Sequence, residues 1–161
     1  MKQTLYTKEE INRIVRTYTA SLLRLAFTYT KNLSDAEDVV QEVMVKLITK
    51  RPEFENVDHE KAWLIRVTIN ISINYMKAAK KRSFVSLDYD VSGIEKSDYG
   101  LLEMLEKLPD KYKSVMYLYY YEGYSVKEIA QILNRQVSTI TTWMSRGRKK
   151  LKDYLEREGL N

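Results

Sequence analysis

Hydroxyl and basic side chains gather on one side of a short segment in the last third of this 161-residue chain. At about 100° per residue, a helix that begins near Ser138 turns Ile140, Met144, Gly147 and Leu151 toward one side. The other side carries, in chain order, Ser138, Thr139, Thr141, Thr142, Ser145, Arg146 and Lys149. Hydroxyls hydrogen-bond to base edges and cations pair with phosphates, so such a helix suits the major groove of duplex DNA.

The residues before this helix complete a helix-turn-helix pattern. Ser125 and Glu128 form an S-x-x-E capping box, which predicts a helix start because it satisfies backbone N–H groups of the first turn. Further polar candidates for DNA contact lie in the turn and the second helix: Arg135, Gln136, and the acid-free cluster Arg146, Arg148, Lys149 and Lys150. Any two amphipathic helices joined by a short turn share part of this pattern. The turn length, the hydroxyl-rich face and the basic cluster favour the DNA-binding interpretation.

A polar stripe marks a second segment, predicted as a long helix over about Glu60–Arg82. A helical wheel places an aromatic ring, two amides and three cations within about 80° of one another, namely Trp63, Arg66, Asn70, Asn74, Lys77 and Lys81. Apolar arcs flank the stripe, and Tyr75 falls in one of them. A solvated face is the alternative, yet such faces are usually rich in Glu and this stripe holds no acid. Amides, a ring and cations fit single-stranded DNA, whose unstacked bases expose faces and edges.

A third segment combines an apolar face with an acidic one. Capping boxes at Thr7–Glu10 and Ser34–Glu37 predict where the first two helices begin. In the second of these helices, which Arg51-Pro52-Glu53 ends, the side predicted to be buried comprises Val39, Val40, Val43, Met44, Leu47 and Ile48. The opposite side carries Asp35, Glu37, Asp38, Gln41, Glu42 and Lys46, and no intramolecular partner for its acids is evident. This acidic face is expected to dock on a basic surface of a partner.

Composition limits the class of protein. Lys and Arg number 27 against 22 Asp and Glu, which gives a net charge of +5. Basic residues gather in two patches, within Lys77–Arg82 and within Arg146–Lys150, and such patches suit a polyanion. The absence of cysteine excludes disulfides and thiolate metal sites, and the single histidine, His59, is expected at a surface helix start. No nucleophile system, phosphate loop or metal cluster is evident, so the chain is predicted not to be an enzyme and to need no metal or cofactor. With neither a membrane-length apolar run nor a signal-peptide core, a cytoplasmic location is expected.

The periodicities predict an all-α fold of two small helical domains. Residues 83–100 lose the helical period, gain turn-forming residues and become acidic, which indicates a flexible linker. The expected domains are therefore 1–82 and 101–161. The second includes a tyrosine-rich helix after Pro109.

Three runs of residues resemble a known family. They are Asp35-Ala-Glu-Asp-Val-Val-Gln-Glu-Val-Met-Val-Lys-Leu, Ala62-Trp-Leu-Ile-Arg-Val-Thr-Ile-Asn-Ile-Ser-Ile-Asn-Tyr, and Leu108-Pro-Asp-Lys-Tyr-Lys with the helix-turn-helix. In this order and spacing they resemble bacterial RNA polymerase sigma factors, specifically the compact extracytoplasmic-function (ECF) type of the sigma-70 family. That type retains only regions two and four, and the resemblance covers most of the chain.

The resemblance implies a role for each polar face. Asp35, Asp38, Gln41 and Glu42 would dock on the clamp helices of the polymerase's largest subunit, and the loop Glu53–Asp58 with the stripe Trp63–Lys81 would recognise and open the minus-ten element. The helix-turn-helix would read the minus-thirty-five element. Implied partners are core RNA polymerase, through its clamp helices and flap, and promoter DNA; many members also bind an anti-sigma factor, often membrane-anchored. No small-molecule substrate is implied.

The chain departs from the family pattern in its DNA-reading helix. Thr141, Thr142 and Trp143 stand where a basic residue, Ser and Arg are usual, Gly147 replaces Ala, and Gln136 replaces an apolar residue or proline. The promoter sequence that it reads should therefore differ. Two other classes stay open at this point: a helix-turn-helix regulator that binds duplex DNA without being a polymerase subunit, and an anti-sigma or other interaction protein built on a sigma-like scaffold.

Overall fold

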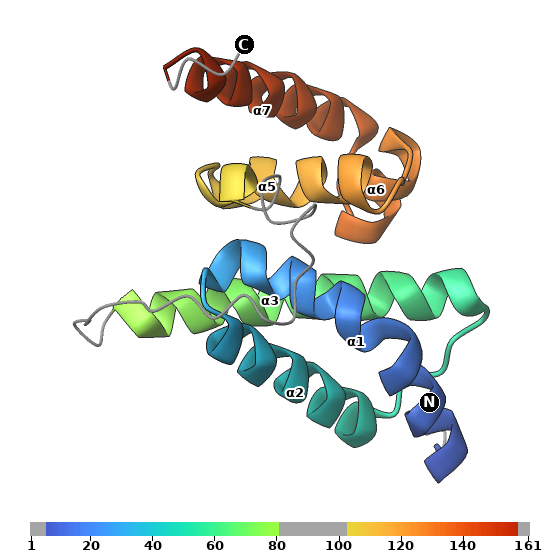
Figure 1. The fold of residues 1–161 in the computed structure, drawn as a ribbon. Helices are drawn as coiled ribbons and strands as arrows, with labels where there is room; N and C mark the ends of the chain where they lie inside the picture. The colour runs from blue at the N-terminus through green and yellow to red at the C-terminus, as the bar shows by residue number, and fades with distance from the viewer. Residues whose placement is uncertain (1–5, 81–102, 158–161) are drawn as a thin grey trace. The chain divides into compact units, whose positions relative to one another are not determined.

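Helices make up both units of the chain. The structure, a computed structural model, describes residues 6–80 and 103–157. These residues fall into an N-terminal unit within 1–94 and a C-terminal unit within 95–161, which are taken one at a time. Every regular element of the described residues is a helix, which confirms the predicted all-α class (Figure 1). The predicted linker, 83–100, lies outside the described residues.

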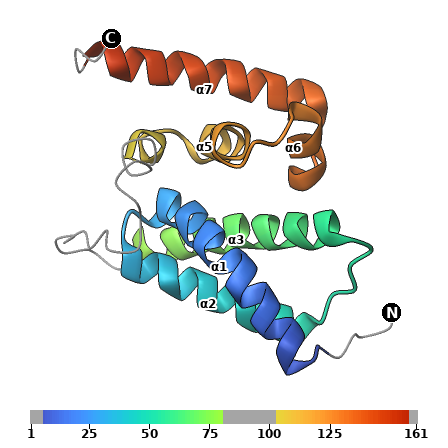
Figure 2. The ribbon, with the colours of Figure 1, turned by 45° about the vertical axis from the view of Figure 1, so that its right-hand side comes forward.

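Three helices pack against one another in the N-terminal unit: α1 (Lys8–Thr30), α2 (Leu33–Lys50) and α3 (Val57–Lys80), seen from two sides in Figures 1 and 2. Each helix contributes one apolar face to a shared core, because apolar residues recur at three- and four-residue spacing. Side chains at most 2% exposed include Ile14, Leu22, Leu25, Phe27, Val39, Val43, Leu47, Leu64 and Ile65.

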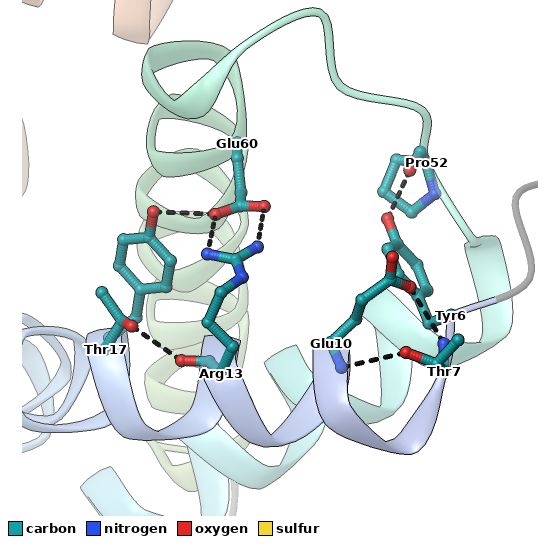
Figure 3. Close-up of polar contacts among 8 residues, drawn as sticks. Tyr6, Thr7, Glu10, Arg13, Thr17, Pro52 and Glu60 are labelled. Atoms are coloured by element: carbon teal, nitrogen blue, oxygen red, sulfur yellow. Dashed lines mark hydrogen bonds and ion pairs between the residues drawn. The ribbon is translucent and has the colours of Figure 1, made fainter.

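The starts of these helices test the capping predictions. Thr7 and Glu10 form the predicted box at α1: the Glu10 N–H donates to Thr7 Oγ1 (3.1 Å) and the Thr7 N–H to Glu10 Oε2 (2.9 Å; Figure 3). The box predicted at Ser34–Glu37 is wrong. Asn32, extended at φ −148°, caps α2 by accepting the Asp35 N–H on Oδ1 (3.0 Å), so Ser34 already lies inside the helix. Asparagine is at least as good an N-cap as serine, and here it comes first along the chain.

The third helix also begins earlier than predicted. It starts at Val57 rather than near Glu60, which shortens the predicted loop Glu53–Asp58. Asn56 accepts the His59 N–H on Oδ1 at 2.8 Å, and His59 is exposed in the first turn, as expected. Lys80 is the last described residue of α3, so the predicted contact residue Lys81 lies outside the described residues.

A buried carboxylate joins α1 to α3. Glu60, 7% exposed, accepts two hydrogen bonds from the Arg13 guanidinium, at 3.1 and 2.8 Å, as Figure 3 shows. The Tyr18 hydroxyl donates a third, at 2.8 Å. A buried carboxylate is tolerated only when it is paired and hydrogen-bonded, so these contacts hold the two helices in register. Nearby, the Tyr6 hydroxyl donates to the carbonyl of Pro52 and ties the chain before α1 to the loop before α3.

We expect this network to weaken at high pH. Burial, and then the bond to Glu60, raise the pKa of Tyr18 from 10.0 to about 12. A raised pKa in the folded state stabilises the fold fully below pH 10, and this stabilisation is lost as the pH rises to about 12. The difference in free energy of unfolding between the native chain and Tyr18→Phe should therefore shrink across that interval, as urea titrations at several pH values would measure. A constant difference would show that Tyr18 does not titrate there.

The C-terminal unit is built on one long helix. The helices described in it include α5 (Asp110–Met116), the π-helix η1 (Tyr117–Tyr121), α6 (Val126–Leu133) and α7 (Val137–Arg157). Both α5 and α6 pack on α7. Gly147 allows this close approach, since a Cβ there would lie 3.0 Å from Met116 Cγ. The sequence predicted one helix for the tyrosine-rich segment. The segment is instead α-helical only at first, and its last five residues form the π-helix η1.

Candidate nucleic-acid and polymerase interfaces

The helix-turn-helix has the geometry that its sequence predicts. Both bonds of the Ser125–Glu128 box are present, at 3.0 and 3.1 Å, and Asn134 ends α6 in the left-handed conformation (φ 55°). Helix α7 buries Ile140, Met144 and Gly147. Of the predicted contact residues, Thr139 is half-buried and the following are exposed: Arg135, Gln136, Ser138, Thr141, Thr142, Ser145, Arg146, Arg148 and Lys149. The structure therefore leaves this polar surface open to a ligand.

Two of the threonine hydroxyls of α7 are already used as donors. Thr141 Oγ1 donates to the carbonyl of Val137 (3.0 Å), and Thr142 Oγ1 donates to the carbonyl of Ser138 (2.9 Å). A hydroxyl has one proton and two acceptor lone pairs, so each oxygen can still accept a bond from outside. The exocyclic amines of adenine and cytosine are the donors in the major groove, and the threonine methyl groups suit thymine.

Two arginines of this surface lie against aromatic rings. Arg148 donates from Nε to the Tyr120 hydroxyl (2.7 Å), and its Cζ lies 5.6 Å and 5.8 Å from the ring centroids of Tyr119 and Tyr120. The Arg135 Cζ lies 5.7 Å from the Trp143 centroid. Sequence reasoning missed both contacts. The tyrosine run was a signal for the contact of Arg148, but the π-helix η1, which contains Tyr119 and Tyr120, is not visible in a helical period.

The stripe on α3 is present for the residues described. Asn70, Asn74 and Lys77 are exposed, whereas Trp63 and Arg66 are half-buried. Arg66 Nε is buried and has no hydrogen-bond partner among residues 6–80 and 103–157, which leaves a donor of this cation unsatisfied at the stripe. The Trp63 ring packs edge-on against Phe54, with 5.8 Å between centroids, so a residue of the preceding loop orients the aromatic end of the stripe.

The acidic face of α2 has an internal partner that the sequence did not reveal. The Tyr75 hydroxyl donates to Asp35 Oδ1 (2.8 Å) and reaches Asp38 Oδ2 (3.4 Å). Burial, and next the bond to Asp35, raise the pKa of Tyr75 above its ordinary value. The sequence placed Tyr75 in an apolar arc, but its hydroxyl group meets two acids of α2. The expectation that these acids lack an intramolecular partner is thus wrong for Asp35 and Asp38.

The rest of this face is open and partly apolar. Asp38, Gln41 and Glu42 are exposed, whereas Asp35 is half-buried. Ile48, predicted to be buried, is 44% exposed, because the buried rows of α2 are filled by Val39, Val40, Val43 and Leu47. Val45 is 62% exposed. Single exposed apolar residues are common on protein surfaces, so it is the exposed carboxylates that make this face a candidate for docking.

Both units match family models. The model described as Sigma-70 region 2 matches residues 14–82, and the model described as Sigma-70, region 4 matches residues 100–151. The chain belongs to the sigma-70 family. The matched regions contain the acidic face, the stripe and the helix-turn-helix.

Relatives place this sigma factor in the ECF group. RNA polymerase sigma factor SigV of Bacillus subtilis (strain 168) is 28% identical over 166 residues, covering 100% of both chains. ECF RNA polymerase sigma factor SigW of the same strain is 28% identical over 164 residues, covering 88% of this chain and 87% of SigW. The fold is similar to that of the sigma factor RpoE of Bartonella quintana, solved in complex with the anti-sigma factor NepR: the TM-score is 0.72 at 22% identity, over 92% of this chain and 98% of that one.

As an alternative sigma factor, the chain directs transcription initiation. Sigma factors are initiation factors of RNA polymerase and not enzymes in their own right. The separate-regulator interpretation is not favoured, because it would leave the match of residues 14–82 to region 2 unexplained. Within residues 6–80 and 103–157, no helix is both long and apolar enough to span a membrane.

Proposed function

We propose that three faces on three helices divide the work of initiation. The acidic face of α2, with Asp38, Gln41 and Glu42, docks on a basic surface of core RNA polymerase, the clamp helices of its largest subunit. The stripe on α3 contacts the melted minus-ten element. The hydroxyl and basic face of α7 reads the minus-thirty-five element, and the flap of the polymerase holds that unit. The domain limits 1–82 and 101–161 are part of this proposal.

The observation that carries the proposal is the separation of chemistry between these faces. Carboxylates and exposed Val45 lie on α2, acid-free amides and cations on α3, and hydroxyls with cations on α7. Asp35 takes a different part from the one assigned to it by resemblance: held by Tyr75, it orients α2 against α3 rather than meeting the polymerase directly. Since bacterial RNA polymerase acts on the chromosome, this role places the chain in the cytoplasm, where an anti-sigma factor would be a further partner.

Reconstituted transcription tests the proposal directly. Core polymerase, the chain and a pool of genomic fragments should give new transcription start sites that neither protein gives alone. The mapped starts should share sequence elements upstream at two separated positions. Tight duplex binding by the chain alone, with no effect of core polymerase, would instead support a separate regulator.

Thr142 and Lys149 should respond differently to substitution on α7. Thr142→Val removes the oxygen that accepts from a base and keeps the methyl group, so it should change which bases the upstream element prefers. Thr142→Ser keeps the oxygen and should retain the preference for an amine-bearing base. Lys149→Ala should weaken all promoters alike and lower the salt slope by about 1, as loss of one phosphate contact predicts.

Transcription from a promoter library with each variant measures both effects. A change of base preference in Lys149→Ala, without one in Thr142→Val, would mean that α7 lies in the groove with the opposite end toward the bases.

A further inference from the structure

The turn of the helix-turn-helix and the second turn of α7 are joined by one cation–aromatic contact. Arg135 follows the left-handed Asn134, and its backbone N–H donates to the carbonyl of Ala130 (2.9 Å), which anchors the turn on α6. Its exposed side chain then lies over Trp143, with the guanidinium carbon 5.7 Å from the ring centroid. Indole is the strongest aromatic partner for a cation, and this distance is within the range of that attraction.

A guanidinium that lies over a ring can keep its hydrogen-bonding edge free. The five N–H donors of arginine lie in the guanidinium plane, while the contact with a ring uses the face. Trp143 therefore restrains a long side chain without using up its donors. Arg148 contrasts with it, because its Nε already donates to the Tyr120 hydroxyl. Of these two ring-held arginines, Arg135 is the one whose side-on Nε–Nη edge no described residue uses, so this edge can form a bidentate bond to phosphate.

The position of the pair also favours phosphate over bases. On the helical wheel Trp143 lies about 100° from Thr142, beside the hydroxyl face and not within it. Arg135 precedes α7, outside the face that would meet base edges. Cations that flank a base-reading helix meet the DNA backbone on the rim of the groove.

We propose that Trp143 is a positioning residue for Arg135, and that the pair forms a sequence-independent phosphate clamp at the leading end of α7. This inference rests on the proposed reading of duplex DNA by α7. It assigns Trp143 a role that none of the polar contact residues has: it presents a cation to the backbone and does not itself read a base.

A double-mutant cycle tests the clamp with holoenzyme, core polymerase carrying the full chain, on promoter fragments with two different upstream elements. Arg135→Gln should weaken binding about five- to tenfold on both and lower the salt slope by about 1, as for one lost phosphate contact. Trp143→Leu should weaken binding several-fold and add little to the loss in Arg135→Gln. Trp143→Phe keeps an aromatic ring and should retain most of the affinity. Arg135→Lys keeps the charge but loses the planar guanidinium and its bidentate edge, so it should lose part of the affinity.

Lys149→Gln is the matched control, because Lys149 is an exposed cation on α7 six residues from Trp143, so its loss should multiply with that of Trp143→Leu. Circular dichroism of each variant excludes unfolding as the cause. If the losses of Arg135→Gln and Trp143→Leu multiply, or if Trp143→Leu changes base preference, the clamp is wrong. If the native holoenzyme shows no promoter-specific binding at all, it is the proposed function that fails.

Discussion

Exchanging Asp38 and Glu42 for lysine should lower the affinity of the chain for core RNA polymerase about a hundredfold, because like charges placed in contact cost several kcal/mol. Both carboxylates are exposed on α2, one helical turn apart, beside exposed Val45. The helices should stay folded, since exposed substitutions usually change stability little. Tyr75 keeps its shorter bond, 2.8 Å to Asp35, when Asp38 is replaced. Titration of core polymerase with labelled chain measures the affinity.

Net charge must be separated from position in this experiment. Glu9→Lys with Glu53→Lys makes the same change in net charge at exposed glutamates outside α2. This control pair should bind core polymerase within a few-fold of the native chain at moderate salt, where distant charges are screened. If both double variants lose the same affinity for core polymerase, the loss is a general effect of net charge and not of the acidic face of α2. If neither double variant loses affinity for core polymerase, α2 is not part of the interface.

Much of the fold follows from local sequence. Apolar residues at three- and four-residue spacing predicted the helices of both units, and the boxes at Thr7–Glu10 and Ser125–Glu128 gave two helix starts to the residue. These features depend on neighbours within one turn, which sequence displays. Asn32 and Ser34 are both suitable N-cap residues for α2. Lys31, the C-cap of α1, adopts the left-handed conformation, and the next residue, Asn32, is extended and caps the helix.

Two of the contacts that sequence did not predict join residues far apart in the chain. Tyr75 of α3 donates to Asp35 of α2, and Arg148 of α7 donates to Tyr120 in the π-helix η1. A helical wheel assigns each side chain one direction and one character, but a tyrosine has an apolar ring and a polar tip. The exposure of Ile48 could not be predicted from the helical wheel either, since only packing between helices decides how many rows of apolar residues a helix buries.

Replacing Asn70 by alanine should leave polymerase binding unchanged and reduce open-complex formation about tenfold to a hundredfold, the value of a good hydrogen-bonded base contact. Asn70 is exposed on α3, between half-buried Arg66 and exposed Asn74. A flipped base offers its hydrogen-bonding edge, and an amide both donates to and accepts from it. Alanine removes both functions without a change of charge. Permanganate footprinting of unpaired thymines measures the extent of the bubble.

The same chemical change elsewhere in the N-terminal unit provides the control. Asn12 is an exposed asparagine on α1, outside the stripe, and Asn12→Ala should open promoters like the native chain. Lys77→Ala should weaken opening on every promoter alike, because a cation contacts the backbone and not a base. Asn70→Ala should weaken it most where the captured base matches the preferred one. A bubble of normal extent in Asn70→Ala would exclude this residue from base capture, and an equal loss in Asn12→Ala would indicate damage to the unit as a whole.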